Sequence, residues 1–308
     1  MPSELVQSAE IQALLDRIGG LDQPVGDLRN KKILRRIISD LFSTIDEFDV
    51  TPEEFWNVVN FLQQGAAEFG LIAPGLGFDH FLDIRMDRAD QAKGIQPGTP
   101  RTIEGPLYVP GAPLTKGYAC LDDGTDKGET LIMQGRVLGS DGAPIGGAIV
   151  DVWHANTMGA YSHFAPALPA YNNRRRIETD VDGRYRFRSI VPSGYAVPSG
   201  GATDRLLQAV GRHGRRPAHI HFFVSASGFR HLTTQINIDG DPDLHDDFAY
   251  ATRDGLIPAV VRREEKTAIA EAGLDGPFSE IDFDFTLTKT KAAAETILPV
   301  RPRAQAPA

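Results

Sequence analysis

The chain has 308 residues, 41% of them hydrophobic, which is enough to bury a core in one large domain or in two. Its formal net charge of −9 argues against non-specific nucleic-acid binding, and its single cysteine, Cys120, excludes an intrachain disulfide framework. The sequence has neither an apolar signal segment near its start nor an apolar span of 18 residues, so we expect a cytoplasmic protein without a membrane or nucleic-acid partner.

The first hundred residues are predicted to be mostly helical. Two amphipathic helices are indicated by apolar residues at helical spacing, first Ile11, Leu14, Leu15 and Ile18, then Leu34, Ile37, Ile38, Leu41 and Ile45. A third helix is expected to begin after Thr51, a good N-cap, because Pro52 suits the first helical position and Glu54 completes a capping box. The apolar faces of these helices can pack either on a second copy of the chain or on their own sheet.

Glycine and proline are dense between Gly75 and Thr115, which predicts an ordered loop or linker. Short apolar runs separated by turn signals then continue to EIDFDFTLT, which is typical of a β-sandwich. We therefore expect a mixed, mainly β chain, with a helical linker or dimerisation domain at residues 1–100 and an antiparallel β-sandwich domain at residues 101–308. A short helix is expected around Glu264 to Ala272, and the tail from Pro299 is expected to be poorly ordered.

Two histidines, His219 and His221, lie two residues apart in the segment RRPAHIHFFVSA. A β-strand would direct both imidazoles to one face, either as a metal site or as a pair of half-buried structural histidines. Tyr161 closes the loop after the predicted strand at Ala148 to Trp153, and Tyr195 follows the turn VPSG. Either tyrosine alone is more typical of an ordinary surface residue at a loop tip.

Six segments occur in the order IEGPLYVPGAP, DVWHANTMGAYSHF, IVPSGY, GRHGRRPAHIHFFVSA, LTTQIN and DDFAYATRDGL. Together they closely resemble the intradiol ring-cleaving dioxygenases, and within that family they are most like the catechol 1,2-dioxygenases. The likeness runs from the N-terminal helices, through PGLGFDHFLDIRMD, nearly to the C-terminus. It implies an enzyme of aromatic catabolism, in the β-ketoadipate pathway, that cleaves catechol with O2 to give cis,cis-muconate.

The resemblance also implies a mononuclear non-haem Fe(III) centre, one per subunit, held by Tyr161, Tyr195, His219 and His221. Anionic oxygen donors are hard and suit Fe(III), and imidazole is a common iron ligand. A phenol with an ordinary pKa of about 10 must be deprotonated by the metal. The family mechanism has Tyr195 dissociate and accept a substrate proton while Tyr161 stays bound.

Further roles carry over from the family motifs. Arg216 matches an arginine beside the substrate, where a permanent cation stabilises negative charge on the ring, and Gln235 matches a glutamine near the iron. Arg215 is expected to be an ordinary surface residue. Motif alignment places the substrate-lining residues at Leu71, Pro74, Ile103, Pro106, Leu107, Phe248 and Ala249. These segments add no further basic group, which favours an uncharged catechol, and the bulk of Leu71 and Ile103 favours catechol over chlorocatechols by a soft margin of about 1–3 kcal/mol.

In this family the N-terminal helices form a homodimer interface, in which an apolar tunnel can hold a phospholipid or fatty acid.

Three competing hypotheses about the function of the chain remain open. One is a hydroxyquinol 1,2-dioxygenase or chlorocatechol 1,2-dioxygenase with the same iron ligands. Another is a zinc or copper hydrolase or oxidase that uses His219 and His221 with an acidic ligand such as Asp151. A third is a non-catalytic β-sandwich binding module with a helical dimerisation arm.

Overall fold

The structure is a computed structural model that describes residues 4–290. The chain divides into two compact units, one up to Ala66 and the other from Ala67 onward. The sequence analysis divided the chain after residue 100, where predicted helices give way to predicted strands. That domain boundary stays a prediction. The tail from Pro299, expected to be poorly ordered, lies outside the described residues.

The first unit is helical, and its described helices are α1 (Glu4–Gln7), α2 (Ala9–Ile18), α3 (Leu28–Glu47) and α4 (Pro52–Gly65). The capping box at Thr51 and Glu54 is present as predicted, because the Thr51 hydroxyl accepts from the Glu54 backbone N–H and the Glu54 carboxylate accepts from that of Thr51. Helices α1, α2 and α3 contact one another around the fully buried Leu15. Helix α3 buries none of its own residues, although it is amphipathic.

The helices of the second unit are α5 (Phe69–Gly75), α6 (Phe78–Ala92), α7 (Ala202–Ala209) and α8 (Lys266–Glu271), and a 3-10 turn, η1 (Ala66–Glu68), precedes α5. The short helix expected near Glu264 is present as α8. The prediction of a loop from Gly75 onward was wrong for α6, because charge rather than an apolar stripe stabilises this helix. Arg101 pairs with Asp87 at 3.0 Å and with Asp90 at 2.6 Å, which ties α6 to the following segment.

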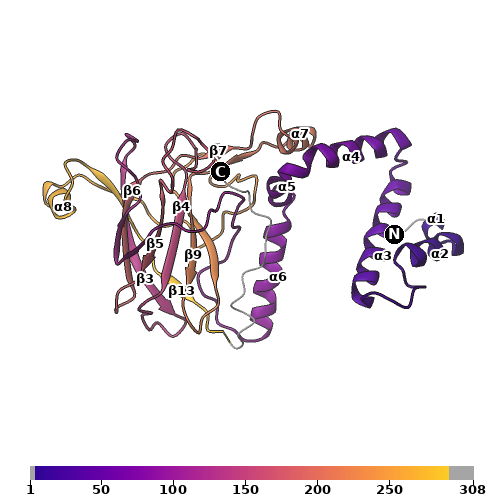
Figure 1. Ribbon diagram of the computed structural model, residues 1–308, viewed down its shortest axis with the longest axis horizontal. Coiled ribbons are helices and arrows are strands. Elements are labelled where there is room, and N and C mark those ends of the chain that lie inside the picture. The colour runs from indigo at the N-terminus through magenta and orange to yellow at the C-terminus, as the bar shows by residue number, and fades with distance from the viewer. Residues whose placement is uncertain (1–3, 291–308) are drawn as a thin grey trace. The chain divides into compact units, whose positions relative to one another are not determined.

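The described strands are β1 (Leu114–Lys116), β2 (Tyr118–Cys120), β3 (Thr130–Gly139), β4 (Ile149–His154), β5 (Arg174–Glu178), β6 (Arg184–Ile190), β7 (Tyr195–Ala196), β8 (Arg215–Arg216), β9 (His219–Ser225), β10 (Leu232–Asn237), β11 (Val261–Arg263), β12 (Phe278–Asp282) and β13 (Phe285–Leu287). One sheet has the order β1-β5-β4-β9-β10. A second has the order β11-β12-β3-β6-β2, and β13 also pairs with β3. The two sheets form the layers of a sandwich (Figure 1), so the expected mainly β sandwich is confirmed, although not its purely antiparallel pairing.

Both sheets are mixed rather than purely antiparallel. The pairs β4–β5, β4–β9, β9–β10, β3–β6 and β11–β12 are antiparallel. By contrast, β1–β5, β2–β6, β12–β3 and β13–β3 are parallel. The core between the layers is apolar: Ile220, Phe222 and Val224 of β9 belong to one buried cluster with Met133 and Phe187 of the second sheet.

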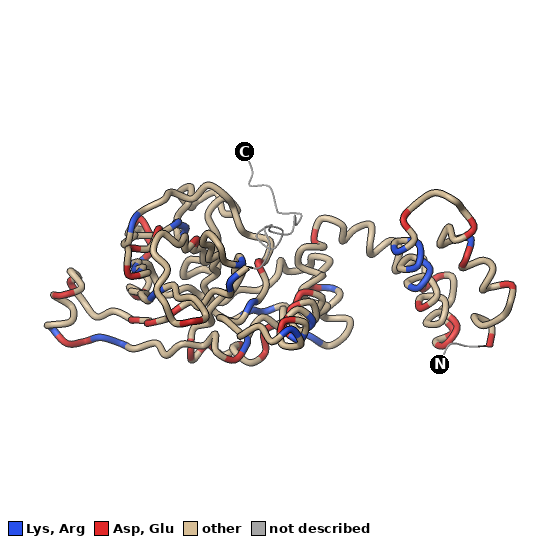
Figure 2. Tube along the Cα trace, turned by 90° about the horizontal axis from the view of Figure 1, so that it is seen from below, with Lys and Arg blue, Asp and Glu red and all other residues tan. Residues whose placement is uncertain are grey.

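Two surface features bear on function class. Acidic and basic residues are interspersed along the trace of the second unit rather than segregated (Figure 2). No helix in the described part of the chain is long and apolar enough to span a membrane.

Candidate active site

The two histidines of β9 lie on the face of their sheet that points away from the sandwich core. Their Nε2 atoms face each other at 3.0 Å, and both side chains are buried. His219 Nδ1 donates to the Pro217 carbonyl at 2.7 Å, because a carbonyl can only accept, and this leaves a lone pair on Nε2. Burial lowers the pKa of His219 to about 3 and that of His221 well below its usual value. Both imidazoles are therefore neutral, as a metal ligand requires.

Trp153 of β4 lies directly opposite His221 in the strand register, and the two rings stack at 5.0 Å with an interplanar angle of 7°. This stacking fixes the plane of the imidazole. His221 Nδ1 is buried without a hydrogen-bond partner among the described residues.

Two loops bring the tyrosines to these histidines. The Asn156 side chain accepts from the backbone N–H groups of Met158 and Ala160, both at 2.9 Å, and so closes the turn that presents Tyr161. Tyr195 lies opposite Arg216 in the two-stranded ladder of β7 and β8.

The aromatic rings meet at close range. The centroid of the Tyr195 ring is 5.6 Å from that of Tyr161 and 5.5 Å from that of His219. The Tyr161 hydroxyl is buried and has no hydrogen-bond partner in the part of the chain that the structure describes. Burial, and then the neighbouring Tyr195, raise the pKa of Tyr161 well above its usual value, so its phenolate form requires a nearby cation.

These residues fit a hard metal ion. Two nitrogen ligands that bind one ion at right angles from about 2.1 Å lie about 3.0 Å apart, which matches the separation of the two Nε2 atoms. No group of three His, Cys, Asp or Glu side chains within residues 4–290 is placed to hold a metal. The acidic candidate Asp151 instead accepts a hydrogen bond from the Tyr108 hydroxyl at 2.9 Å.

Arg216 is buried at the centre of a polar network. Its Nη1 lies 3.0 Å from His219 Nε2, and its Nη2 donates to Gln235 Oε1 at 2.8 Å. Asp247 pairs with it through both carboxylate oxygens, at 3.2 Å each. Burial alone would raise the pKa of Asp247, but the Arg216 guanidinium outweighs burial and lowers it, so Asp247 is charged. The structure thus brings the predicted Arg216 and Gln235 together beside His219, while their catalytic roles stay a prediction.

Four of the seven predicted pocket residues belong to, or pack against, one of two buried apolar clusters. Ile103, Phe248 and Ala249 share one buried apolar cluster, to which Leu207 of α7 also belongs. Leu107 packs against the cluster that contains Tyr161. The remaining three are placed less directly: Leu71 and Pro74 lie on α5, which contacts α7, and Pro106 lies beside Gly70. That these side chains line a substrate pocket stays a prediction.

Comparison with known proteins gives a clear family. The family model described as "Dioxygenase" matches residues 103–289, and the model described as "Catechol dioxygenase N terminus" matches residues 27–94. The chain belongs to the intradiol ring-cleaving dioxygenase family. This intradiol dioxygenase is therefore an oxidoreductase.

Three relatives illustrate the match. Catechol 1,2-dioxygenase 2 of Acinetobacter lwoffii is 59% identical to this dioxygenase over 264 residues, which is 84% of this chain and 96% of that protein. The structure of catechol 1,2-dioxygenase from Acinetobacter sp. ADP1 inhibited by bound mercury has a TM-score of 0.93 at 49% identity, covering 98% of this chain and 99% of that one. Hydroxyquinol 1,2-dioxygenase of Rhizobium sp. (strain MTP-10005) is 32% identical, covering 92% of this chain and 96% of that protein.

Two buried charged residues of this dioxygenase escaped prediction. Arg174 lies with its guanidinium 5.7 Å from the centre of the Tyr161 ring, and its Nε donates to Ser162 Oγ at 2.8 Å. The run RRRIET predicts a strand but does not reveal which arginine is buried. Asp247 could have been predicted from the sequence. It directly precedes the predicted pocket residues Phe248 and Ala249, and a buried Arg216 needs a counter-ion.

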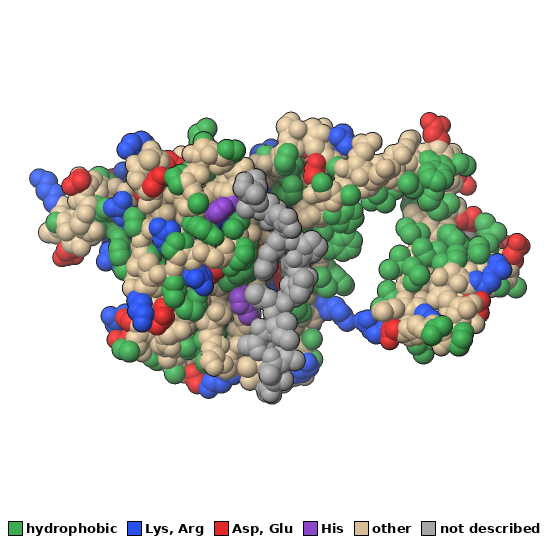
Figure 3. Space-filling view, in the orientation of Figure 1, with side chains coloured by type: hydrophobic (Ala, Val, Ile, Leu, Met, Phe, Trp, Pro, Cys, Tyr) green, Lys and Arg blue, Asp and Glu red, His purple; other side chains and the backbone are tan. Residues whose placement is uncertain are grey.

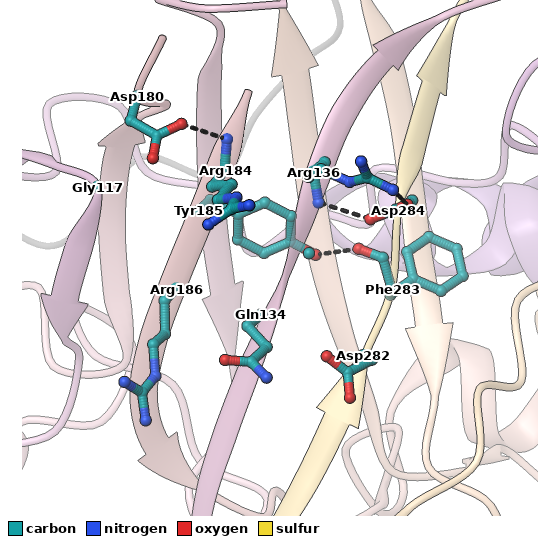
Figure 4. A pocket seen from close by; sticks show the side chains of 11 residues that line it. Gly117, Gln134, Arg136, Asp180, Arg184, Tyr185, Arg186, Asp282, Phe283 and Asp284 are labelled. Carbon is teal, nitrogen blue, oxygen red and sulfur yellow. Dashed lines mark hydrogen bonds and ion pairs between the residues drawn. The ribbon is translucent and has the colours of Figure 1, made fainter. Parts of the chain in front are cut away.

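A separate depression of about 800 Å³ lies among β3, β6 and the segment around Asp282 (Figure 4). Some of its polar groups pair with one another. Arg136 pairs with Asp284 at 3.2 Å, and the Tyr185 hydroxyl donates to the Phe283 carbonyl at 2.8 Å. None of the predicted site residues lines this depression.

Proposed function

We propose that this dioxygenase cleaves catechol between its two hydroxyl-bearing carbons and places both atoms of O2 in the product, cis,cis-muconate. The observation that carries the proposal is the convergence of two neutral histidines and two tyrosines beside the buried Arg216. The catechol-cleaving relatives at 49–59% identity support the same substrate over hydroxyquinol, whose relative is 32% identical.

We propose one Fe(III) per subunit, held by Tyr161, Tyr195, His219 and His221. Bound there, ferric ion supplies a Lewis acid for the catechol oxygens and an acceptor for electron density from the ring. The two tyrosinates contribute two negative charges, so little net charge is buried. Tyr161 is 3% exposed whereas Tyr195 is half-buried, which supports Tyr195 as the phenolate that leaves and accepts a substrate proton at its oxygen.

Arg216 holds a permanent positive charge and is buried, with 3% of the residue exposed. A charge fixed in this way stabilises negative charge that develops on the ring, and it costs no reorganisation during the reaction. Gln235 accepts from Arg216 Nη2 and donates through Nε2 to Asn237 at 2.8 Å, so it holds the arginine from the sheet side. A metal on His219 Nε2 would occupy the lone pair that Arg216 Nη1 now contacts, which frees this N–H for the substrate.

Apolar residues from three parts of the chain would surround the ring, and an apolar wall favours an uncharged catechol.

The experiment that tests the proposal is the visible spectrum of the purified protein before and after anaerobic addition of catechol. We expect a tyrosinate-to-iron charge-transfer band that shifts when catechol binds. A colourless protein with stoichiometric zinc or copper would refute the ferric assignment. Turnover of benzene-1,2,4-triol but not of catechol would establish the hydroxyquinol alternative.

We further propose a homodimer formed through the first unit. Apolar side chains gather over α3 and α4 (Figure 3), and Leu34, Ile37 and Leu41 of α3 are each 45–53% exposed. An amphipathic helix of 20 residues that buries none of them within its own chain needs a partner surface. Sedimentation equilibrium tests the dimer. The same surface suits an acyl chain, so mass spectrometry of an organic extract tests the predicted phospholipid or fatty acid.

A cytoplasmic location suits the single, unpaired Cys120.

A further inference from the structure

We propose, on the basis of the dioxygenase activity proposed above, that Asp247 is a positioning residue, which fixes Arg216 and the adjoining pocket wall as one unit. The wall consists of Phe248 and Ala249, the two residues that follow Asp247. Because one carboxylate holds both parts, the ring of the substrate would meet the arginine at a fixed position. Asp247 would therefore determine which ring substituents are accepted, as well as how well the arginine acts.

The first part of this unit is the ion pair. Asp247 Oδ1 accepts from Arg216 Nε and Asp247 Oδ2 accepts from Nη2, so the contact is bidentate and restrains rotation of the guanidinium. Both side chains are almost completely buried, with 4% and 1% exposed. Gln235 takes the other hydrogen of Nη2, which leaves Nη1 directed toward His219. The position of Nη1 thus depends on Asp247.

The second part is the turn that carries the pocket wall. The same two carboxylate oxygens accept backbone N–H groups, Oδ1 from Ala249 at 3.0 Å and Oδ2 from Ala251 at 3.3 Å. Between them Tyr250 has a φ of 54°, which a non-glycine residue adopts only when neighbouring contacts enforce it. Asp247 supplies two of those contacts, and Arg212 supplies others, since its Nη2 donates to the Phe248 carbonyl at 2.9 Å and its guanidinium lies 4.7 Å from the centre of the Tyr250 ring. A shift of the carboxylate would therefore move Ala249 and Arg216 together.

A neighbouring ion pair offers a matched control. Arg215 precedes Arg216 in the chain and pairs with Asp243, whose two oxygens both accept from Arg215 Nε, at 3.0 Å each. That pair is open to solvent, since 54% of the Arg215 side chain is exposed. No other described residue accepts a hydrogen bond from the Arg215 side chain, and the Asp243 side chain holds no pocket residue. The two pairs share their chemistry and differ in burial and in what they hold.

The test compares Asp247→Asn with Asp243→Asn in the iron-loaded full-length protein. For Asp247→Asn we expect the turnover number per bound iron to fall about 10- to 100-fold, the range seen when an orienting partner is lost. The ratio of kcat/KM for 4-methylcatechol to that for catechol should change by about tenfold, because the wall moves relative to the arginine. The iron content and the visible band of the resting protein should stay as in the parent, since none of the four proposed ligands contacts Asp247. Asp243→Asn should leave all of these unchanged.

A role confined to stability would give a different result. Activity would then fall only in proportion to the folded or iron-loaded fraction, and an unchanged substrate ratio would overturn the proposal. If Asp247→Asn does not fold, Asp247→Glu retains the charge but lengthens the side chain by one carbon. This variant should keep iron while still altering the substrate ratio, and an unaltered ratio would likewise refute positioning by Asp247.

Amide hydrogen exchange separates failure of this inference from failure of the proposed function. Exchange at Ala249 and Ala251 should accelerate in Asp247→Asn relative to Asp243→Asn whether or not the protein turns over catechol. Unchanged exchange at these two amides would exclude Asp247 as the residue that holds the turn. A parent protein without an iron band and without turnover would instead refute the proposed function.

Discussion

The two faces of the sheet β1-β5-β4-β9-β10 are built from the same strands but differ in the side chains that pack on them. On β9, Ile220, Phe222 and Val224 point into the sandwich core, where they are completely buried among other apolar groups. The alternate residues His219 and His221 point to the opposite face, and there they meet a tryptophan, two tyrosines and an arginine. Both faces are buried, yet one is packed by apolar side chains alone, whereas the other combines an aromatic cluster with paired polar groups.

The difference teaches how a buried strand can carry chemistry without weakening the fold. Because successive residues of a strand point to opposite sides, the core can be packed tightly while its reverse side presents ligands. The polar side is costly wherever a partner is absent, which is why the orphaned Tyr161 hydroxyl indicates a ligand that completes it. Variants on each face should therefore fail in different ways.

The largest effect should come from His221→Ala on the polar face. Loss of one proposed ligand should reduce iron binding and turnover by well over the roughly 10- to 100-fold that orienting residues contribute. The core face is untouched, so the melting temperature of the metal-free variant should remain close to that of the metal-free parent. Iron analysis and calorimetry measure both quantities. A variant that retains iron and turnover would show that His221 is one of the structural histidines that the sequence left open.

Phe222→Ala tests the opposite face, one residue away. Removing a buried aromatic ring costs about 3–5 kcal/mol, which lowers the melting temperature by roughly 10 °C in a unit of this size. Phe222 contacts the core rings Phe187 and Phe285 and none of the proposed ligands. The turnover number per bound iron should therefore be that of the parent at a temperature where the variant is folded. A large change in turnover at full iron content would mean that the two faces are coupled through the strand.

Sequence reasoning predicted the elements whose signal is local. The capping box at Thr51, the strands and the HxH pair all follow from spacing, and the family motifs located the two tyrosines. It failed for α6, because that helix is held by ion pairs to Arg101, in the following segment, and to Arg253, which is distant in sequence. It also missed Arg174, since no local pattern reports which arginine of RRRIET is buried. Long-range charge pairing is thus the information that a single sequence lacks.

Asp151, which also lies on the polar face, should make the stability of the protein depend on pH. Its carboxyl group is buried and accepts a side-chain hydrogen bond from Tyr108. Burial raises its pKa to about 6, and the hydrogen bond from Tyr108 only partly opposes this. A raised carboxyl pKa adds stability below the unfolded-state pKa, near 4, and that stability is lost as pH rises to about 6. Asp151→Asn removes this loss. Relative to the parent, the variant should therefore gain up to about 2–3 kcal/mol between pH 4 and pH 7, measured by urea unfolding. A difference that is independent of pH would show that Asp151 ionises normally in the folded protein.

The smallest effect should come from Ile236→Val and Ile220→Val, which remove one methylene each from the core face. The two residues are completely buried and directly paired across β10 and β9, while their neighbours Gln235 and His221 form the corresponding pair on the polar face. Each substitution should cost about 0.5–1.5 kcal/mol. Because the side chains are neighbours, the double variant should depart from the sum by on the order of 0.5 kcal/mol or more. The turnover number should stay within about twofold of the parent in all three proteins, since a loss of one methylene disturbs packing but shifts a well-paired strand very little. A larger change in turnover from so small a cavity would mean that the position of His221 depends on the exact packing behind it, and the two faces would then have to be treated as one unit.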